Sequence, residues 1–119
     1  MMNYLTRDLV NLRLALKHRQ SYRLIPMRYT CRNGLISSDL LLEMLNRSRV
    51  NQPVLEHIPS DLVSLDTLAQ RLAPTGITRP QLFRWANRKR DPLPHIRFNG
   101  HTRRFSLSLC DAWLAGGKR

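Results

Sequence analysis

The stretch SLDTLAQRLAPTGITRPQLFRWANRKRDPLPHIRFNGHTRRFSLSLCDAWL (residues 64–114) contains the clearest structural signals of the chain. Its first part repeats apolar residues at helical spacing and stops at the Pro-Thr-Gly sequence of residues 74–76, which predicts a short helix and a tight turn. Thr78 and Gln81 have the spacing of a capping box, in which each side chain accepts a hydrogen bond from the other residue's backbone N–H, and Pro80 suits a first helical turn. The stretch therefore opens with two predicted helices separated by a turn.

A β-hairpin is predicted after these helices. Asn99-Gly100 separates two runs that alternate apolar and polar residues, which is the strongest short-range hairpin signal. Strand alternation places Ile96 and Phe98 on the same face. We expect Phe105 to join them on the inner face of the hairpin and Arg104 to lie on the outer face.

A third helix closes this part of the chain. Ser106 or Ser108 can act as its N-cap, and Gly116-Gly117 is predicted to end it. The order helix, turn, helix, hairpin, helix is typical of a winged helix-turn-helix, which we predict for residues 61–115, followed by a basic tail over residues 116–119. The predicted fold class is mainly α with a small β-hairpin wing, preceded by an N-terminal extension.

The N-terminal extension, residues 1–60, is predicted to be helical. One helix spans Asn3–Gln20, because four leucines recur there on one helical face. These leucines are Leu5, Leu9, Leu12 and Leu16. A second helix spans Asp39–Asn46, with Ser38 or Asp39 as its N-cap. The leucine face predicts packing onto the winged part or onto a second copy of the chain.

The charge of the chain is strongly positive. Among its 119 residues are 20 Lys/Arg and 8 Asp/Glu, a net charge of +12. Residues 79–104 alone hold eight Lys/Arg and a single acid, Asp91. This balance favours a polyanion, because each Lys or Arg beside a phosphate releases condensed counterions. No run approaches the roughly 18 apolar residues of a membrane span, and the N-terminus lacks the basic region of a signal peptide, so we expect no membrane partner and a cytoplasmic location.

No arrangement of residues predicts catalysis. No Gly-rich phosphate loop or paired-carboxylate signature occurs, and the four histidines are scattered without metal-ligand spacing to a cysteine or carboxylate. These histidines are His18, His57, His95 and His101. We therefore expect neither an enzyme nor a cofactor or metal site. Cys31 and Cys110 are interpreted as reduced thiols of a cytosolic protein, Cys110 in the core, with a disulfide between them as the alternative.

The second predicted helix, roughly residues 79–90, has two unlike faces. Leu82, Trp85 and Ala86 cluster on one side and are predicted to face the core. The opposite side carries arginine, asparagine and glutamine, which make bidentate contacts to base edges in the major groove. The residues predicted to contact DNA from this helix and its N-cap are Thr78, Arg79, Pro80, Gln81, Phe83, Arg84, Asn87 and Arg88. The alternative is a charged, solvated surface without a partner.

The predicted hairpin is basic around its turn. A basic hairpin placed after such a helix can lie along the phosphate backbone or enter the minor groove. Its predicted DNA contacts are Arg97, Asn99, Gly100, His101, Thr102, Arg103 and Arg104. The alternative is a hairpin that only closes the core, a role that its apolar residues also support.

Several short motifs occur together in the order found in one group of proteins. They are Leu-x-x-Leu-Ala, Arg-Pro-Gln-Leu-Phe-Arg-Trp, Leu-Pro-His-Ile-Arg-Phe-Asn-Gly, Arg-Arg-Phe and Ala-Trp-Leu. Through them residues 62–115 resemble the small MerR-like winged-helix proteins of mobile genetic elements, a group that includes excisionases and phage transcriptional regulators. The resemblance covers under half of the chain and does not extend to the N-terminal extension.

The resemblance implies a sequence-specific double-stranded DNA-binding protein. Its leading form is an excisionase-like factor that bends DNA and directs the recombination of a mobile element, with a site-specific integrase as partner, in a bacterial or phage-infected cell. The alternative is a repressor or activator of phage or mobile-element genes. An RNA-binding basic protein and a protein-interaction module are further alternatives. Residues 1–60 would then serve self-association, contact an integrase, or add DNA-contacting area.

Overall fold

The computed structural model describes residues 4–31, 33–99 and 102–117. Within these residues the chain forms the α-helices α1 Arg7–Arg13, α2 His18–Leu24, α3 Ser38–Arg47, α4 Leu65–Leu72, α5 Arg79–Asn87 and α6 Leu107–Ala115. The strands are β1 Tyr4–Leu5, β2 Ile36–Ser37, β3 Arg49–Val50, β4 Leu62–Val63, β5 His95–Arg97 and β6 Arg103–Ser106. Two 3-10 turns complete the structure, η1 Met27–Tyr29 and η2 Ala73–Thr75. The expected mainly helical fold class is confirmed, and in place of a lone β-hairpin the structure has small antiparallel sheets.

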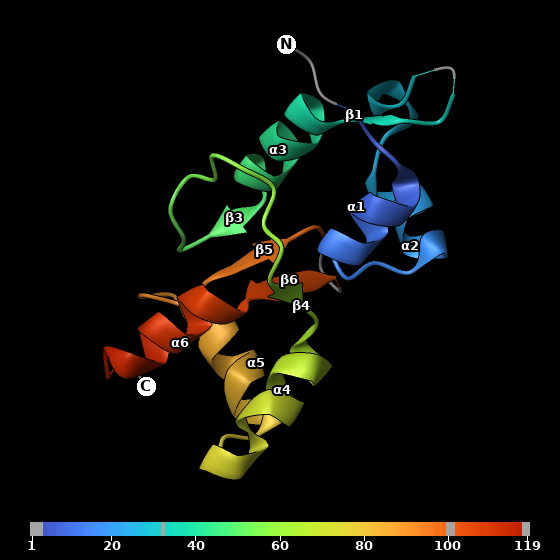
Figure 1. Cartoon of the computed structure of the whole chain (residues 1–119). Helices are drawn as coiled ribbons and strands as arrows, with labels where there is room; N and C mark the ends of the chain where they lie inside the picture. The colour runs from blue at the N-terminus through green and yellow to red at the C-terminus, as the bar shows by residue number, and fades with distance from the viewer. Residues whose placement is uncertain (1–3, 32, 100–101, 118–119) are drawn as a thin grey trace.

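The centre of the molecule is a four-stranded antiparallel sheet in the order β3-β5-β6-β4. Figure 1 shows α1, α2 and α3 on one side of this sheet and α4, α5 and α6 on the other. Because β3 comes from the N-terminal half and pairs with β5, the sheet takes strands from both halves of the chain. A separate two-stranded sheet joins β1 to β2. The molecule is elongated, with extents of 47 × 25 × 22 Å.

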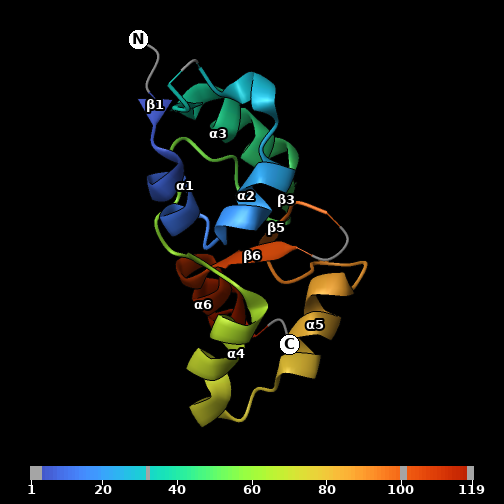
Figure 2. The ribbon, with the colours of Figure 1, turned by 90° about the vertical axis from the view of Figure 1, so that its right-hand side faces the viewer.

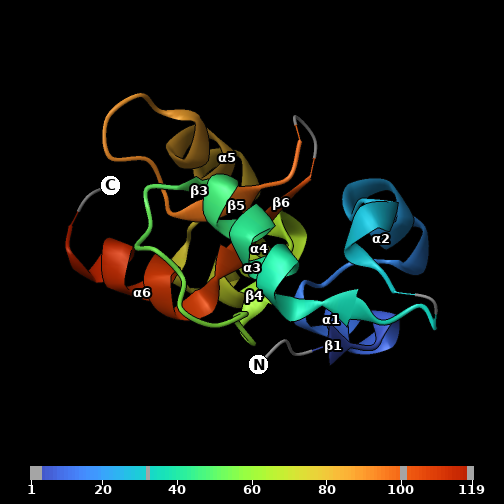
Figure 3. The ribbon, with the colours of Figure 1, turned by 90° about the horizontal axis from the view of Figure 1, so that it is seen from above.

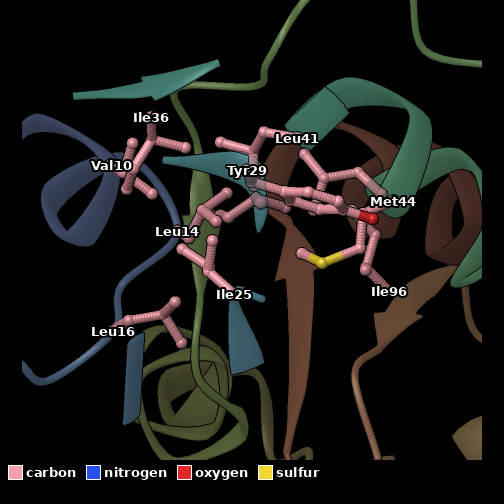
Figure 4. Packing of buried hydrophobic residues seen from close by; sticks show 11 residues of the cluster. Val10, Leu14, Leu16, Ile25, Tyr29, Ile36, Leu41, Met44 and Ile96 are labelled. Carbon is pink, nitrogen blue, oxygen red and sulfur yellow. The ribbon is translucent and has the colours of Figure 1, made fainter. Parts of the chain in front are cut away.

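Each face of the central sheet carries its own apolar cluster. The upper cluster is formed by the N-terminal helices and by Ile96 of β5. Figure 4 shows Ile96 beside Met44, with Tyr29 in the same cluster. The lower cluster is formed by α4, α5 and α6 together with Phe105 of β6. Ile96 and Phe105 therefore point to opposite faces, and the expectation that they share an inner face is wrong. Both faces of the hairpin carry buried residues, because the N-terminal extension covers the face that was expected to be exposed to solvent.

Arg104 occupies the upper face, contrary to the prediction that it lies outside. It is paired with Ile96 across the strands, and residues directly opposite in an antiparallel pair point to the same face. Arg104 is buried, and its guanidinium donates to the backbone oxygens of Leu14 at 3.0 Å and Ala15 at 3.0 Å. Burial lowers the pKa of Arg104. The side chain holds the N-terminal segment, so Arg104 is not the exposed outer-face donor on which its predicted DNA contact was based.

The single N-terminal helix predicted for Asn3–Gln20 is also wrong. Two short helices, α1 and α2, replace it, since Ala15 between them has a left-handed φ of 53°. The predicted leucine stripe fails with it, because Leu12 is 78% exposed while Val10 and Leu14 are fully buried. The carbonyls of Leu14 and Ala15, in the turn that follows α1, accept hydrogen bonds from Arg104.

Most predicted helix ends are confirmed, with two corrections. Thr78 and Gln81 form the capping box of α5, and Ser106 caps α6. The N-cap of α3 is Ser37 rather than either predicted residue, since its hydroxyl accepts from the N–H of Leu40. The α5 helix ends at Asn87, three residues before its predicted end, because the backbone turns extended at the next residue.

Cys31 and Cys110 are both free thiols, and Cys110 is buried in the lower cluster as expected. Burial raises the pKa of the Cys110 thiol to about 12, so it stays protonated at neutral pH.

Among the residues that the structure describes, no helix has the length and apolar character needed to cross a membrane.

Replacing Arg104 with alanine should destabilise the protein by about 2–4 kcal/mol, because the carbonyls at the end of α1 lose their charged donors inside the protein. Urea denaturation would measure this loss. Arg71→Ala is the matched control, since that exposed arginine pairs with Asp111 at 3.3 Å and should contribute under about 1 kcal/mol. Equal losses in the two variants would contradict the role given to Arg104.

Candidate nucleic-acid interface

The orientation of α5 is set by its apolar side. Leu82 and Ala86 are buried in the lower cluster, and Trp85 packs against Trp113 with ring centroids 5.8 Å apart. Since this side faces inward, the opposite side must face solvent. The exposed residues of α5 are Arg79, Pro80, Phe83, Arg84 and Asn87, as predicted for a contact face.

The N-terminal end of α5 is held by polar contacts. The Gln81 side-chain oxygen accepts from the backbone N–H of Thr78 at 2.9 Å, so only its NH₂ group is left to bond a ligand. Arg79 forms an ion pair with Asp66 at the start of α4. Both partners are more than half exposed, and such pairs contribute little to stability. A phosphate could therefore replace Asp66 as the partner of Arg79 at small cost.

Arg84 lies at the middle of the exposed face. Its side chain is exposed and makes no hydrogen bond or ion pair with any residue that the structure describes. The same is true of the side chains of Lys89, Arg90 and Arg97. Lys89 and Arg90 were not among the predicted contacts, although the basic run after α5 was visible in the sequence. Four cations thus lie on α5, the loop after it and β5 without an acidic partner in the described chain.

Arg88 is placed differently from its predicted position on the helix. It follows the last residue of α5 and donates from Nε to the backbone oxygens of Arg90 at 2.9 Å and Asp91 at 3.0 Å. Its guanidinium also lies 4.9 Å from the ring centroid of Trp113. These contacts hold the loop between α5 and β5, and they leave Arg88 less free to read a base than its position in the sequence suggested.

Asn87 connects α5 to the β5–β6 hairpin. Its side-chain oxygen accepts from the Arg103 guanidinium at 2.6 Å, and its NH₂ group donates to the Phe83 carbonyl at 3.0 Å. The same guanidinium lies 5.5 Å from the Phe83 ring centroid. Both ends of the Asn87 amide are therefore occupied, and the hairpin is fixed to the outer face of α5 by these three side chains.

Positive charge is concentrated on the hairpin. Arg97 and Arg103 are directly opposite each other on β5 and β6. Burial lowers the pKa of Arg103, and the charge of Arg97 lowers it further. Like charges in opposed positions destabilise a sheet, so this pair lowers the stability of the free protein and favours a bound anion.

The predicted hairpin is confirmed by the pairing of β5 with β6 and by bonds between residues that flank the turn. The Phe98 N–H donates to the Thr102 carbonyl at 2.9 Å, and the Thr102 N–H donates to the Asn99 side-chain oxygen at 2.8 Å. Gly100 and His101, both predicted contacts, lie outside the described residues.

A groove of about 690 Å³ lies beside Phe83 and Arg103. One wall comes from α5 and the start of α4, another from β6, and a third from the segment before and within α2. Lys17 and Gln20 form this third wall. Sequence reasoning missed the groove because no local pattern places the N-terminal extension next to α5.

Among the described residues, no group of three or more histidine, cysteine, aspartate or glutamate side chains is placed to hold a metal ion. The surface offers guanidinium, ammonium and amide donors, together with one half-exposed aromatic ring. Such a donor set suits phosphates and base edges.

The buried His95 makes the stability of the protein pH-dependent. Burial lowers its pKa from 6.5, and the charges of Arg103 and Arg97 lower it further, against the hydrogen bond between Nδ1 and the Leu93 carbonyl. The unfolded chain therefore binds more protons, and stability should be complete above about pH 6.5 and fall as the pH drops below it. The urea concentration at the unfolding midpoint, measured between about pH 5 and pH 8, would show this dependence of stability on pH. His95→Gln should flatten it, while His18→Gln, at an exposed position, should not; an unchanged slope in His95→Gln would assign it to other groups.

Comparisons of the chain with protein-family models, with curated proteins and with solved structures found no match.

Proposed function

We propose that this protein is a sequence-specific double-stranded DNA-binding protein of the winged helix-turn-helix type. In this proposal α4 and α5 are the helix-turn-helix, and the β5–β6 hairpin is the wing. The observation that carries it is the set of four exposed cations without an acidic partner in the described chain, which lie on or beside a helix whose other side is buried. These cations are Arg84, Lys89, Arg90 and Arg97.

The recognition step is assigned to the exposed side of α5. An α-helix fits the major groove of B-DNA, where arginine binds guanine through two hydrogen bonds. Arg84 is suited to this contact because its guanidinium is exposed and makes no hydrogen bond or ion pair with any described residue. The NH₂ group of Gln81 can donate to a second base. Asn87, whose amide is already occupied, serves instead to hold the wing.

The backbone contacts are assigned to the wing and to the loop after α5. Phosphates between Arg97 and Arg103 would relieve the repulsion of this cross-strand pair. Lys89 and Arg90 would extend the contact along the same strand. Such contacts position the protein on DNA without reading its sequence, and they make the affinity depend on salt.

The biological use of this binding is proposed from the resemblance of residues 62–115 to excisionases and phage regulators. An excisionase-like protein would bind repeated sites at a recombination junction and bend the DNA, at a cost of about 1–6 kcal/mol that the added contacts offset. A transcriptional regulator would use the same interface at a promoter. Selecting bound duplexes from a random pool would identify the sites and separate these two uses by their position in the genome.

Arg84→Ala should cost about 1–3 kcal/mol of affinity on the selected duplex and relax the base preference at one position. Arg97→Ala should weaken selected and random duplexes alike and reduce the salt slope by about 1. Fluorescence anisotropy with both duplexes at several salt concentrations would measure these effects. No enriched motif in the selection, or equal binding to RNA and DNA duplexes, would contradict the proposed function.

A further inference from the structure

The β5–β6 hairpin lies between two helices, not beside one. Figure 2 shows α2 on one side of β6 and α5 on the other, and Figure 3, seen from above, shows the same arrangement. The groove described above connects the two sides, since Lys17 and Gln20 face it from α2 and the residue before it, and Arg79 and Phe83 face it from α5. A ligand that runs along the hairpin therefore meets both helices.

The position of α2 beside the hairpin is fixed by bonds. Arg104 of β6 binds the two backbone oxygens at the end of α1 and reaches the Gln20 side-chain oxygen at 3.5 Å. Arg7 of α1 donates to Ser21 of α2 at 3.1 Å and lies over the Tyr22 ring at 4.0 Å. The contacts of Arg104 and Arg7 therefore hold α2 in a fixed orientation toward the hairpin.

One edge of α2, together with the residue before the helix, carries basic side chains, and Lys17 and Gln20 of this edge line the groove. Ser21 is buried and Leu24 half-buried, which sets the inward side of the helix. Lys17, Gln20 and Arg23 are spaced by three residues, so they lie along one edge, and Gln20 lines the groove. Arg19 is adjacent to this edge.

No acid neutralises this basic edge. Lys17, Arg19 and Arg23 are exposed, and their side chains form no ion pair with any described residue. Residues 9–38 hold six Lys/Arg and no Asp or Glu. A solvated helix without a partner more usually mixes both signs, as stabilising pairs three or four residues apart require.

We propose that α2 contacts the phosphate backbone of DNA through Lys17, Arg19 and Arg23, so that one duplex is held on both sides of the hairpin. This inference rests on the proposed function and assigns a role to part of residues 1–60. The occupant is the phosphodiester backbone because the edge offers only cationic and amide donors, which suit phosphate oxygens but no apolar partner. The contact is independent of sequence and adds to affinity alone.

The test compares two double variants of the full chain that lose the same charge. Arg19→Ala/Arg23→Ala removes the proposed contact. Arg13→Ala/Arg71→Ala is the control, because Arg13 lines a separate hollow with Asp39 and Glu56 and Arg71 pairs with Asp111. Thermal unfolding establishes that both variants are folded, and Arg19→Lys/Arg23→Lys should bind as the unchanged protein does.

The first double variant should reduce the slope of log affinity against log salt by about 2, equally on selected and random duplexes, while the control should keep the slope. Hydroxyl-radical footprinting should show protection lost at one flank of the site only. Unchanged slope and footprint would overturn the contact of α2, and if Arg84→Ala still relaxes base preference, the proposed function stands without it. If the unchanged protein binds no duplex, both proposals fail together.

Discussion

The guanidinium of Arg104 binding the carbonyls of Leu14 and Ala15 is the interaction on which the arrangement of the molecule depends. It lies on the face of the sheet opposite to Phe105, where an arginine would ordinarily be expected in solvent. Burying a charge is costly unless hydrogen bonds compensate, and here the acceptors are the carbonyls of the turn that follows α1. One side chain thus binds the turn between α1 and α2 and attaches the N-terminal segment to the central sheet.

The attachment has a consequence for the surface. Because α2 is held above the hairpin and α5 below it (Figure 2), one groove is bordered by Lys17 and Gln20 on one side and by Arg79 and Phe83 of α5 on the other. Asn87, Arg103 and Phe83 fix the hairpin to α5 in the same way. The backbone elements that carry these side chains therefore have set positions, which in the proposed complex would lower the entropic cost of binding.

The positive charges of this surface repel one another and so lower the stability of the free protein. Arg97 is opposite Arg103 across the strands, and Arg97, Arg84, Lys89 and Arg90 all lack acidic partners in the described chain. Repulsion among them opposes folding and is relieved by a polyanion. The two apolar clusters and the Arg104 bonds must hold the fold against this repulsion, and they lie on both faces of the same sheet.

Local signals determined the elements of residues 64–117. The capping box at Thr78, the cap at Ser106 and the hairpin around Asn99 depend on bonds between residues a few positions apart, so the sequence alone predicts them. The break at Ala15, the inward side of Arg104 and the placement of α2 beside α5 depend on contacts about 90 residues apart in the chain. No local pattern encodes such contacts, because an arginine in an alternating strand faces solvent unless another segment covers it. The sequence by itself determined that α5 and the hairpin carry basic and amide side chains, and only the tertiary structure decided which of these are exposed without a partner among the described residues.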